Sequence, residues 1–182
     1  FPIRERSLFV SASIGISIYP DDGQDSTSLL KNADTAMYRA KERGKNQYQF
    51  FADEMKVIAL QRMTIESGLR LALDAGHFTV VYQPKIELGS QRLIGAEALL
   101  RWDDPSLGPV SPTQFIPIAE HCGLINAVGD ATIKIVLNQM RAWYSEGLEL
   151  CPISINVSSH QLRNTEFAHQ LAAQISNSGV PA

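Results

Sequence analysis

A very short connection between two strand-like runs limits what this chain can fold into. Residues 78–86 and 92–102 are dominated by apolar residues, and the turn-forming stretch 88–91, Leu-Gly-Ser-Gln, separates them. Parallel neighbours need a crossover of roughly a dozen or more residues, so a connection this short demands an antiparallel hairpin. The sequence therefore predicts two antiparallel strands here.

The chain beyond the hairpin alternates between helical and strand-like patterns. Ser111 followed by Pro112 is typical of a helix start, because serine caps the first turn and proline suits the first helical position. The expected elements are a loop at 103–109, a helix at 112–122, a helix through 128–144 that ends at Gly147, a strand at 152–157 and a helix from Asn164 to Asn177. This alternation predicts an α/β fold around a mainly parallel sheet.

The second strand of the hairpin carries an acid and a guanidinium on one face. Side chains alternate across a strand, which places Glu97, Leu99 and Arg101 on one face and Ala98 and Leu100 on the other. A carboxylate is a hard oxygen ligand for Mg²⁺ or Mn²⁺, and arginine is a forked partner for a phosphate. The pattern indicates a metal-assisted site for a phosphate ester. A buried Glu97–Arg101 ion pair is the alternative that spacing alone leaves open.

Two amides lie near strand ends. Gln83 is close to the end of the first hairpin strand, where its amide can contact a base edge, a phosphate oxygen or only solvent. Asn156 is close to the C-terminal end of the strand at 152–157, the end at which barrel enzymes place catalytic groups. Its oxygen is an acceptable ligand for a hard cation, although asparagine here is also a common turn former.

Residues 1–52 follow a pattern of their own. An alternating β-branched run at 7–19 predicts a strand, and 48–51 is a second short strand. Between them an apolar stripe predicts a helix that starts at Ser28 and is stopped by Gly44. Lys41 lies in the last turn of this helix and Lys45 lies just beyond it. Compensation of the helix dipole accounts for both lysines without a ligand.

A long helix is expected to join the two patterns. Apolar residues recur at helical spacing through 53–75, and Gly76-His77 ends the run, with His77 as a C-terminal cap. The stretch has no Pro/Gly/Ser-rich segment, so it is predicted to be a stiff connector.

Charge and composition exclude several partners. A net charge of −3 leaves no basic footprint for duplex nucleic acid, so a nucleotide ligand is expected to be small and bound in a pocket. No apolar run approaches the roughly 20 residues of a membrane span.

The two cysteines, Cys122 and Cys151, are too few for a disulfide framework, which favours a reducing, cytoplasmic compartment. The chain starts without methionine or a signal-peptide pattern, so we expect a longer protein whose upstream segments could tether it to the inner membrane.

The first part resembles a known family in ordered blocks. The blocks are Ser11–Ile16, Asp22-Gly23, Ala33–Lys41 and Gly44–Asn46. They resemble the C-terminal part of a GGDEF domain, the α+β domain of diguanylate cyclases, which make cyclic di-GMP from two GTP, and of degenerate regulatory relatives. The resemblance implies that Lys41 and Lys45 lie near nucleotide phosphates, with lysine replacing the usual arginine at the second position. The family's signature loop would lie upstream of Phe1.

The second half resembles the EAL family throughout. The matching blocks are Tyr82–Lys85, Gly95–Trp102, Phe115–Glu120 and Ile155–Ser158. EAL enzymes linearise cyclic di-GMP to the dinucleotide pGpG, and their fold is a (β/α)₈-type barrel whose first strand is antiparallel to its neighbour. The resemblance thus implies a GGDEF–EAL tandem protein, of which this chain holds a partial barrel preceded by the end of the GGDEF domain.

The EAL resemblance implies a role for each candidate residue. Glu97 and Asn156 would be metal ligands of the catalytic site, Arg101 would hold a phosphate, and Gln83 and Leu99 would contact the dinucleotide. The implied mechanism is two-metal hydrolysis with Mg²⁺ or Mn²⁺, in which the cations lower the pKa of a bound water and neutralise the leaving oxygen.

The expected organisation has three parts: the end of a GGDEF domain at 1–52, a helical connector at 53–76 and the first half of an EAL domain at 77–182. A full barrel takes about 250 residues, so this stretch alone is expected to be inactive, to bind metal weakly and to expose strand edges. The leading hypothesis is a cyclic di-GMP phosphodiesterase in the parent protein. A catalytically silent cyclic di-GMP receptor and a dual-function protein with a GTP-binding, active cyclase stay open, and a homodimer is compatible with each.

Overall fold

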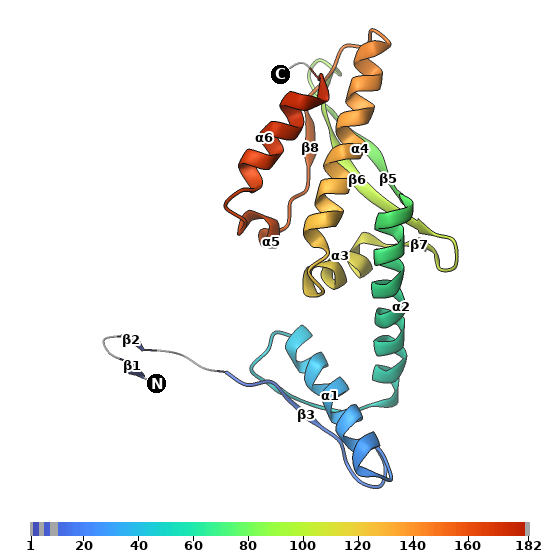
Figure 1. Cartoon of the computed structure of the whole chain (residues 1–182), viewed down its shortest axis with the longest axis vertical. Coiled ribbons are helices and arrows are strands. Elements are labelled where there is room, and N and C mark those ends of the chain that lie inside the picture. Colours follow the sequence, from blue (N-terminus) through green and yellow to red (C-terminus); the bar gives the residue numbers. More distant parts are fainter. Residues whose placement is uncertain (1, 4–5, 8–10, 181–182) are drawn as a thin grey trace. The chain divides into compact units, whose positions relative to one another are not determined.

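The structure, a computed structural model, describes residues 2–3, 6–7 and 11–180 and divides into two compact units (Figure 1). The first unit is Phe1–Thr64 and the second is Ile65–Ala182. The units share no sheet and each has its own buried cluster, so each is described by itself.

The first unit is built on a strand–helix–strand arrangement. Strand β3 (Ile14–Ile16) pairs in parallel with β4 (Tyr48–Phe50), and helix α1 (Ser26–Glu42) connects them. A separate antiparallel pair is formed by β1 (Pro2–Ile3) and β2 (Arg6–Ser7). The predicted strand at 7–19 is therefore shorter than expected, and its residues 8–10 lie outside the described part of the chain.

Close packing of β3 on α1 depends on one glycine. A Cβ atom on Gly15 would lie 1.8 Å from the carbonyl oxygen of Ala33, so only glycine permits this approach. The helix begins at Ser26, two residues earlier than predicted, and Asp25 is its N-cap. The Asp25 carboxylate accepts a 2.8 Å hydrogen bond from the Ser28 amide, and this bond lowers the pKa of Asp25.

The sheet of the second unit is centred on one strand. Strand β6 (Leu93–Asp104) pairs antiparallel with β5 (Phe78–Ile86) and with β7 (Gly108–Val110), and parallel with β8 (Ile153–Ile155). The predicted hairpin is confirmed. The loop predicted at 103–109 is wrong, because β6 continues to Asp104 and returns through β7, and the predicted strand at 152–157 is confined to β8.

Helices cover one face of this sheet (Figure 1). They are α3 (Pro112–His121), α4 (Ile125–Ser145) and the second part of α2 (Asp53–Ala75), which begins in the first unit. Helices α5 (Ser159–Leu162) and α6 (Phe167–Ser178) pack against α4. The bounds of α2 agree with the predicted connector helix. The predicted helix from Asn164 is wrong at its start: α6 begins at Phe167, and Asn164 instead accepts a 3.1 Å hydrogen bond from the Glu166 amide. Within the described ranges, no helix is both long and apolar enough to cross a membrane.

The core of the second unit lies between the sheet and these helices. Trp102 of β6 is 1% exposed and meets Phe115 of α3 edge to face, with ring centroids 5.5 Å apart. Phe78 of β5 contacts both rings at 6.0 Å. Aromatic pairs in this geometry contribute about 0.5–1.5 kcal/mol beyond their buried area. The alternate residues of β5 and β6 therefore point away from this core, to the face that the helices leave uncovered.

A glycine-to-alanine exchange tests the pairing of β6 with β8. A Cβ atom on Gly95 would lie 2.9 Å from the carbonyl oxygen of Pro152, which accepts a 3.0 Å hydrogen bond from the Ala96 amide. Backbone atoms must shift, so Gly95→Ala is expected to lower the free energy of unfolding by about 1–3 kcal/mol. Urea unfolding followed by tryptophan fluorescence measures this, because both tryptophans lie in the second unit. Gly89→Ala, in an exposed turn with nothing within 4 Å of an added Cβ, is the matched control, and equal losses in the two variants would contradict the packing.

An unpartnered hydroxyl gives a pH-dependent prediction. The Tyr82 hydroxyl is buried without a hydrogen-bond partner, and burial raises its pKa above 10.0. Tyr82→Phe is expected to raise the free energy of unfolding at neutral pH by about 1 kcal/mol, because an unsatisfied group is removed. Above pH 10 the unfolded chain loses the Tyr82 phenol proton before the folded chain does, so the free energy of unfolding of the wild type falls as the pH rises. Tyr82→Phe has no phenol at this position, so its free energy of unfolding lacks this part of the fall. Tyr144→Phe, an exchange at an exposed position, is the control, and parallel pH curves for wild type and Tyr82→Phe would refute the prediction.

Candidate functional site

The candidate residues lie on the uncovered face of the sheet. In the register of the strands, Gln83 of β5 is opposite Glu97 of β6, and Glu97 is opposite Ser154 of β8. Cross-strand neighbours share a face, so these three side chains form one row across the sheet. Leu99 and Arg101 follow Glu97 along β6 on the same face, as the alternation predicted.

Glu97 and Asn156 are brought together from positions 59 residues apart. Asn156 follows the last residue of β8, and its Nδ2 donates a 2.8 Å hydrogen bond to Oε1 of Glu97. The carboxylate is half-buried and the amide is exposed. This bond joins an acid on one strand to an amide at the C-terminal end of its parallel neighbour, where barrel enzymes carry their catalytic groups.

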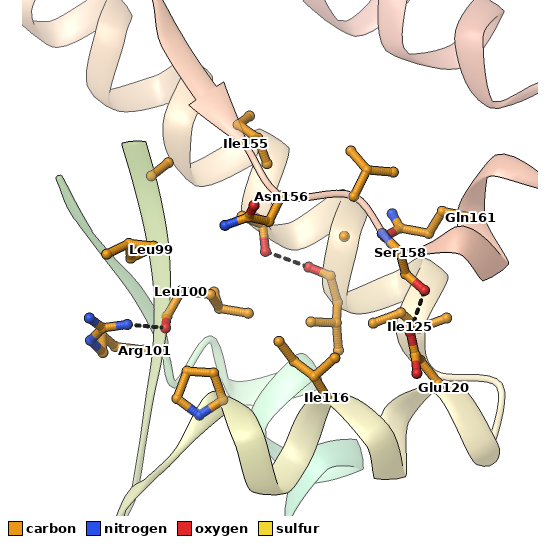
Figure 2. Close-up of a pocket in the computed structure, with 16 residues that line it drawn as sticks. Leu99, Leu100, Arg101, Ile116, Glu120, Ile125, Ile155, Asn156, Ser158 and Gln161 are labelled. Carbon is orange, nitrogen blue, oxygen red and sulfur yellow. Dashed lines mark hydrogen bonds between the residues drawn. The ribbon is translucent and has the colours of Figure 1, made fainter. Parts of the chain in front are cut away.

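Arg101 lies further along the same strand. Figure 2 shows Leu99 and Arg101 side by side on β6, with the amide of Asn156 directed toward that strand. Nη1 of Arg101 donates a 2.8 Å hydrogen bond to the carbonyl oxygen of Leu100. Among the residues described, no ion pair joins Arg101 to Glu97, so the alternative of a buried pair is wrong. One backbone acceptor uses one of the five guanidinium N–H groups, which leaves donors for an anion.

Two polar residues of this face were not singled out from the sequence. Nζ of Lys85 donates a 2.5 Å hydrogen bond to Oγ of Ser154, which donates to the carbonyl oxygen of Ala96 at 3.2 Å. Lys85 is opposite Gly95, so it crosses the middle strand where that strand has no side chain. Lys85 alternates with Gln83 along β5, and Ser154 alternates with Asn156, so the sequence alone would have placed Lys85 and Ser154 on this face. The contact between Lys85 and Ser154 depends on the order of the strands in the sheet.

The donor set on this face suits a hard divalent cation. Carboxylate and amide oxygens are the ligands that Mg²⁺ and Mn²⁺ prefer, and Glu97 and Asn156 carry one of each. The Nδ2–Oε1 hydrogen bond keeps the two side chains together and leaves the Asn156 oxygen out of that contact. In the described part of the chain, no group of three or more His, Cys, Asp or Glu side chains is placed to hold a metal ion. Glu97 and Asn156 therefore fit as two members of a ligand set.

Lys41 and Lys45 lie in the first unit, near the end of α1. Lys41 is exposed in the last turn, and Lys45 follows Gly44 in a left-handed conformation with φ of 61°. The Lys45 amide and the Gln47 side chain both donate to the carbonyl oxygen of Ala40, at 3.0 and 3.1 Å. These bonds hold the turn and leave both lysine side chains exposed.

The second unit is a four-stranded α/β arrangement with an acid in the middle of β6 and an amide directly after β8, both on the face that the helices leave uncovered. Residues 66–182 match the family model of the EAL domain, and residues 1–47 match that of the diguanylate cyclase, GGDEF domain. The chain belongs to the EAL family and carries GGDEF sequence before its EAL domain.

Curated relatives are similar to this sequence over most of the chain. The bifunctional diguanylate cyclase/cyclic di-GMP phosphodiesterase MucR of Pseudomonas aeruginosa is 40% identical over 169 residues, which are 93% of this chain and 24% of MucR. The cyclic di-GMP phosphodiesterase PdeR of Escherichia coli is 37% identical over 155 residues, 85% of this chain and 23% of PdeR. The chain thus spans about a quarter of the length of the curated relatives it matches.

Solved structures of EAL proteins resemble the chain. The phosphodiesterase of P. aeruginosa MucR, in complex with c-di-GMP, has a TM-score of 0.60 and 32% identity, covering 64% of this chain and 47% of that one. The EAL enzyme Bd1971 with cAMP and cyclic-di-GMP bound has a TM-score of 0.61 and 26% identity, covering 88% and 42%. EAL domains have a TIM-barrel-like fold, which confirms the predicted fold class.

Proposed function

We propose that the protein containing this chain is a cyclic di-GMP phosphodiesterase that linearises its substrate to pGpG. The observation that carries the proposal is the contact between Glu97 and Asn156, in line with Arg101 on the uncovered face of the sheet. The names of MucR and PdeR and the c-di-GMP complex of MucR support it.

We propose that Glu97 and Asn156 hold Mg²⁺ or Mn²⁺ together with ligands from the rest of the barrel. When bound, these cations supply a water of lowered pKa and neutralise charge on the leaving oxygen. These cations need oxygen ligands, which explains why an acid and an amide, rather than two apolar residues, occupy this row.

The other residues of the face bind and orient the dinucleotide. The forked guanidinium of Arg101 holds a phosphate, because its planar N–H groups match two phosphate oxygens at once. The Gln83 amide, opposite Glu97, reads a base edge or a phosphate oxygen, and Leu99 between Glu97 and Arg101 offers an apolar contact to a base. Asn156 also fixes Glu97 through its 2.8 Å hydrogen bond.

We assign turnover to the full-length protein and predict none for these 182 residues alone. The chain covers 47% of the MucR phosphodiesterase structure, and two-metal hydrolysis needs more carboxylates than the one that contacts Asn156. We also propose that the GGDEF part ends at residue 52, that 53–76 is a helical connector and that the EAL part begins at 77. We further propose a cytoplasmic location, a homodimer, and GTP binding near Lys41 and Lys45 in the full-length protein.

Neutralising Glu97 tests the phosphodiesterase assignment. Glu97→Gln keeps the size of the side chain and removes its charge, so turnover of cyclic di-GMP to pGpG with Mg²⁺ or Mn²⁺ should fall at least about 100-fold, since even outer-shell partners of a metal cost 10–100-fold. The matched control is Glu87→Gln, an acid that bonds Ser90 in the exposed hairpin turn. Wild-type protein that binds cyclic di-GMP but never releases pGpG would contradict the assignment and favour the silent receptor.

Substitution of Arg101 tests the phosphate contact. Arg101→Lys keeps the charge but loses the fork, so KM for cyclic di-GMP should rise about tenfold, the equivalent of one charged hydrogen bond, and Arg101→Met should raise it further. Arg92→Met removes an exposed arginine from the same hairpin and should leave KM unchanged. Equal KM values for wild type and both Arg101 variants would eliminate the proposed role.

A further inference from the structure

A hydrogen bond links helix α3 to the loop that carries Asn156. Oγ of Ser158, two residues beyond Asn156, donates to Oε1 of Glu120 at 2.5 Å, across 38 residues of sequence (Figure 2). Both side chains are half-buried and line the same cavity as Asn156. A short hydroxyl–carboxylate bond of this kind is roughly twice as strong as a neutral one.

Capping of the next helix does not require this bond. Ser158 is the N-cap of α5: its Oγ accepts from the His160 amide at 3.1 Å, and its own amide donates to Oε1 of Gln161 at 3.0 Å. A capping serine acts through its oxygen as an acceptor, so the hydroxyl proton is left over. Glu120 accepts the hydrogen bond that this hydroxyl donates, so the acid restrains the loop and not the cap of α5.

The loop is held from two other sides as well. Gln161 is only 4% exposed, and a Cβ atom on Gly129 of α4 would lie 2.0 Å from Nε2 of Gln161. The backbone of α4 therefore packs directly against the Gln161 amide. On the sheet side, Asn156 donates its hydrogen bond to Glu97. Val157 alone separates Asn156 from Ser158, so a shift at Ser158 moves the backbone of Asn156.

We infer that Glu120 is a positioning residue, which fixes the amide of Asn156 against Glu97 through its bond to Ser158. The inference rests on the proposed function, because it assigns Glu120 a part in presenting the ligand pair to a divalent cation. Partners that orient metal ligands in this way typically change metal affinity 10–100-fold when they are lost.

Three variants of the full-length protein test this role. Glu120→Ala removes the acceptor, Glu120→Gln keeps an acceptor oxygen, and Ser158→Asp keeps the cap of α5 while removing the donated proton. Glu149→Ala, at an exposed acid in the loop before β8, is the control. Binding of Mn²⁺ is measured by its EPR signal, which needs no turnover, and thermal unfolding is recorded for every variant.

The expected result is an Mn²⁺ dissociation constant about tenfold higher in Glu120→Ala and Ser158→Asp, and within about twofold of wild type in Glu120→Gln and Glu149→Ala. If Glu120→Ala fails to fold, Ser158→Asp and Glu120→Gln carry the same comparison. Unchanged Mn²⁺ binding in both disruptive variants, or equal losses in Glu120→Gln and Glu120→Ala, would overturn the inference. Wild type that binds Mn²⁺ without releasing pGpG would remove the phosphodiesterase assignment alone, and wild type that does neither would remove both.

Discussion

The second unit depends on the two-faced character of strand β6. Every other strand of this sheet pairs with β6, so its side chains are fixed from both edges. Ala96, Ala98 and Trp102 are buried beneath the helices, and a slip of one residue would bury Glu97 and Arg101 instead. Burial of an unpaired charge costs several kcal/mol, so the apolar face specifies the register and thereby places the polar row.

The helices that cover the apolar face also restrain the polar one. Phe115 anchors α3 in the core, and Glu120 of the same helix reaches the loop behind Asn156. Helix α4 contacts that loop through Gly129 and Gln161. Helices α3 and α4, which pack on one side of the sheet, therefore also restrain the loop that orients the Asn156 amide at the edge of the sheet. This is expected of a site held by rigid elements.

The sequence predicted what depends on periodicity and local chemistry. The hairpin, the bounds of α2 and β5, and the face shared by Glu97, Leu99 and Arg101 follow from alternation and from one short turn. Strand β7 was missed, because Asp103 and Asp104 read as a loop while pairing with β6 supplies the strand. The start of α6 was misplaced because Asn164 caps a turn instead of the helix. Contacts such as Glu120–Ser158 join residues 38 apart, and no local pattern encodes them.

The central claim is that Glu97 and Asn156 form one cation site beside a phosphate-binding arginine. A crystal structure of the full-length protein grown with Mn²⁺ and cyclic di-GMP, with data collected at the manganese absorption edge, tests it most directly. The account predicts an anomalous peak within about 2.5 Å of oxygens from both side chains, with a substrate phosphate against Arg101. Anomalous peaks bound only by other residues, with Glu97 and Asn156 still bonded to each other, would contradict it.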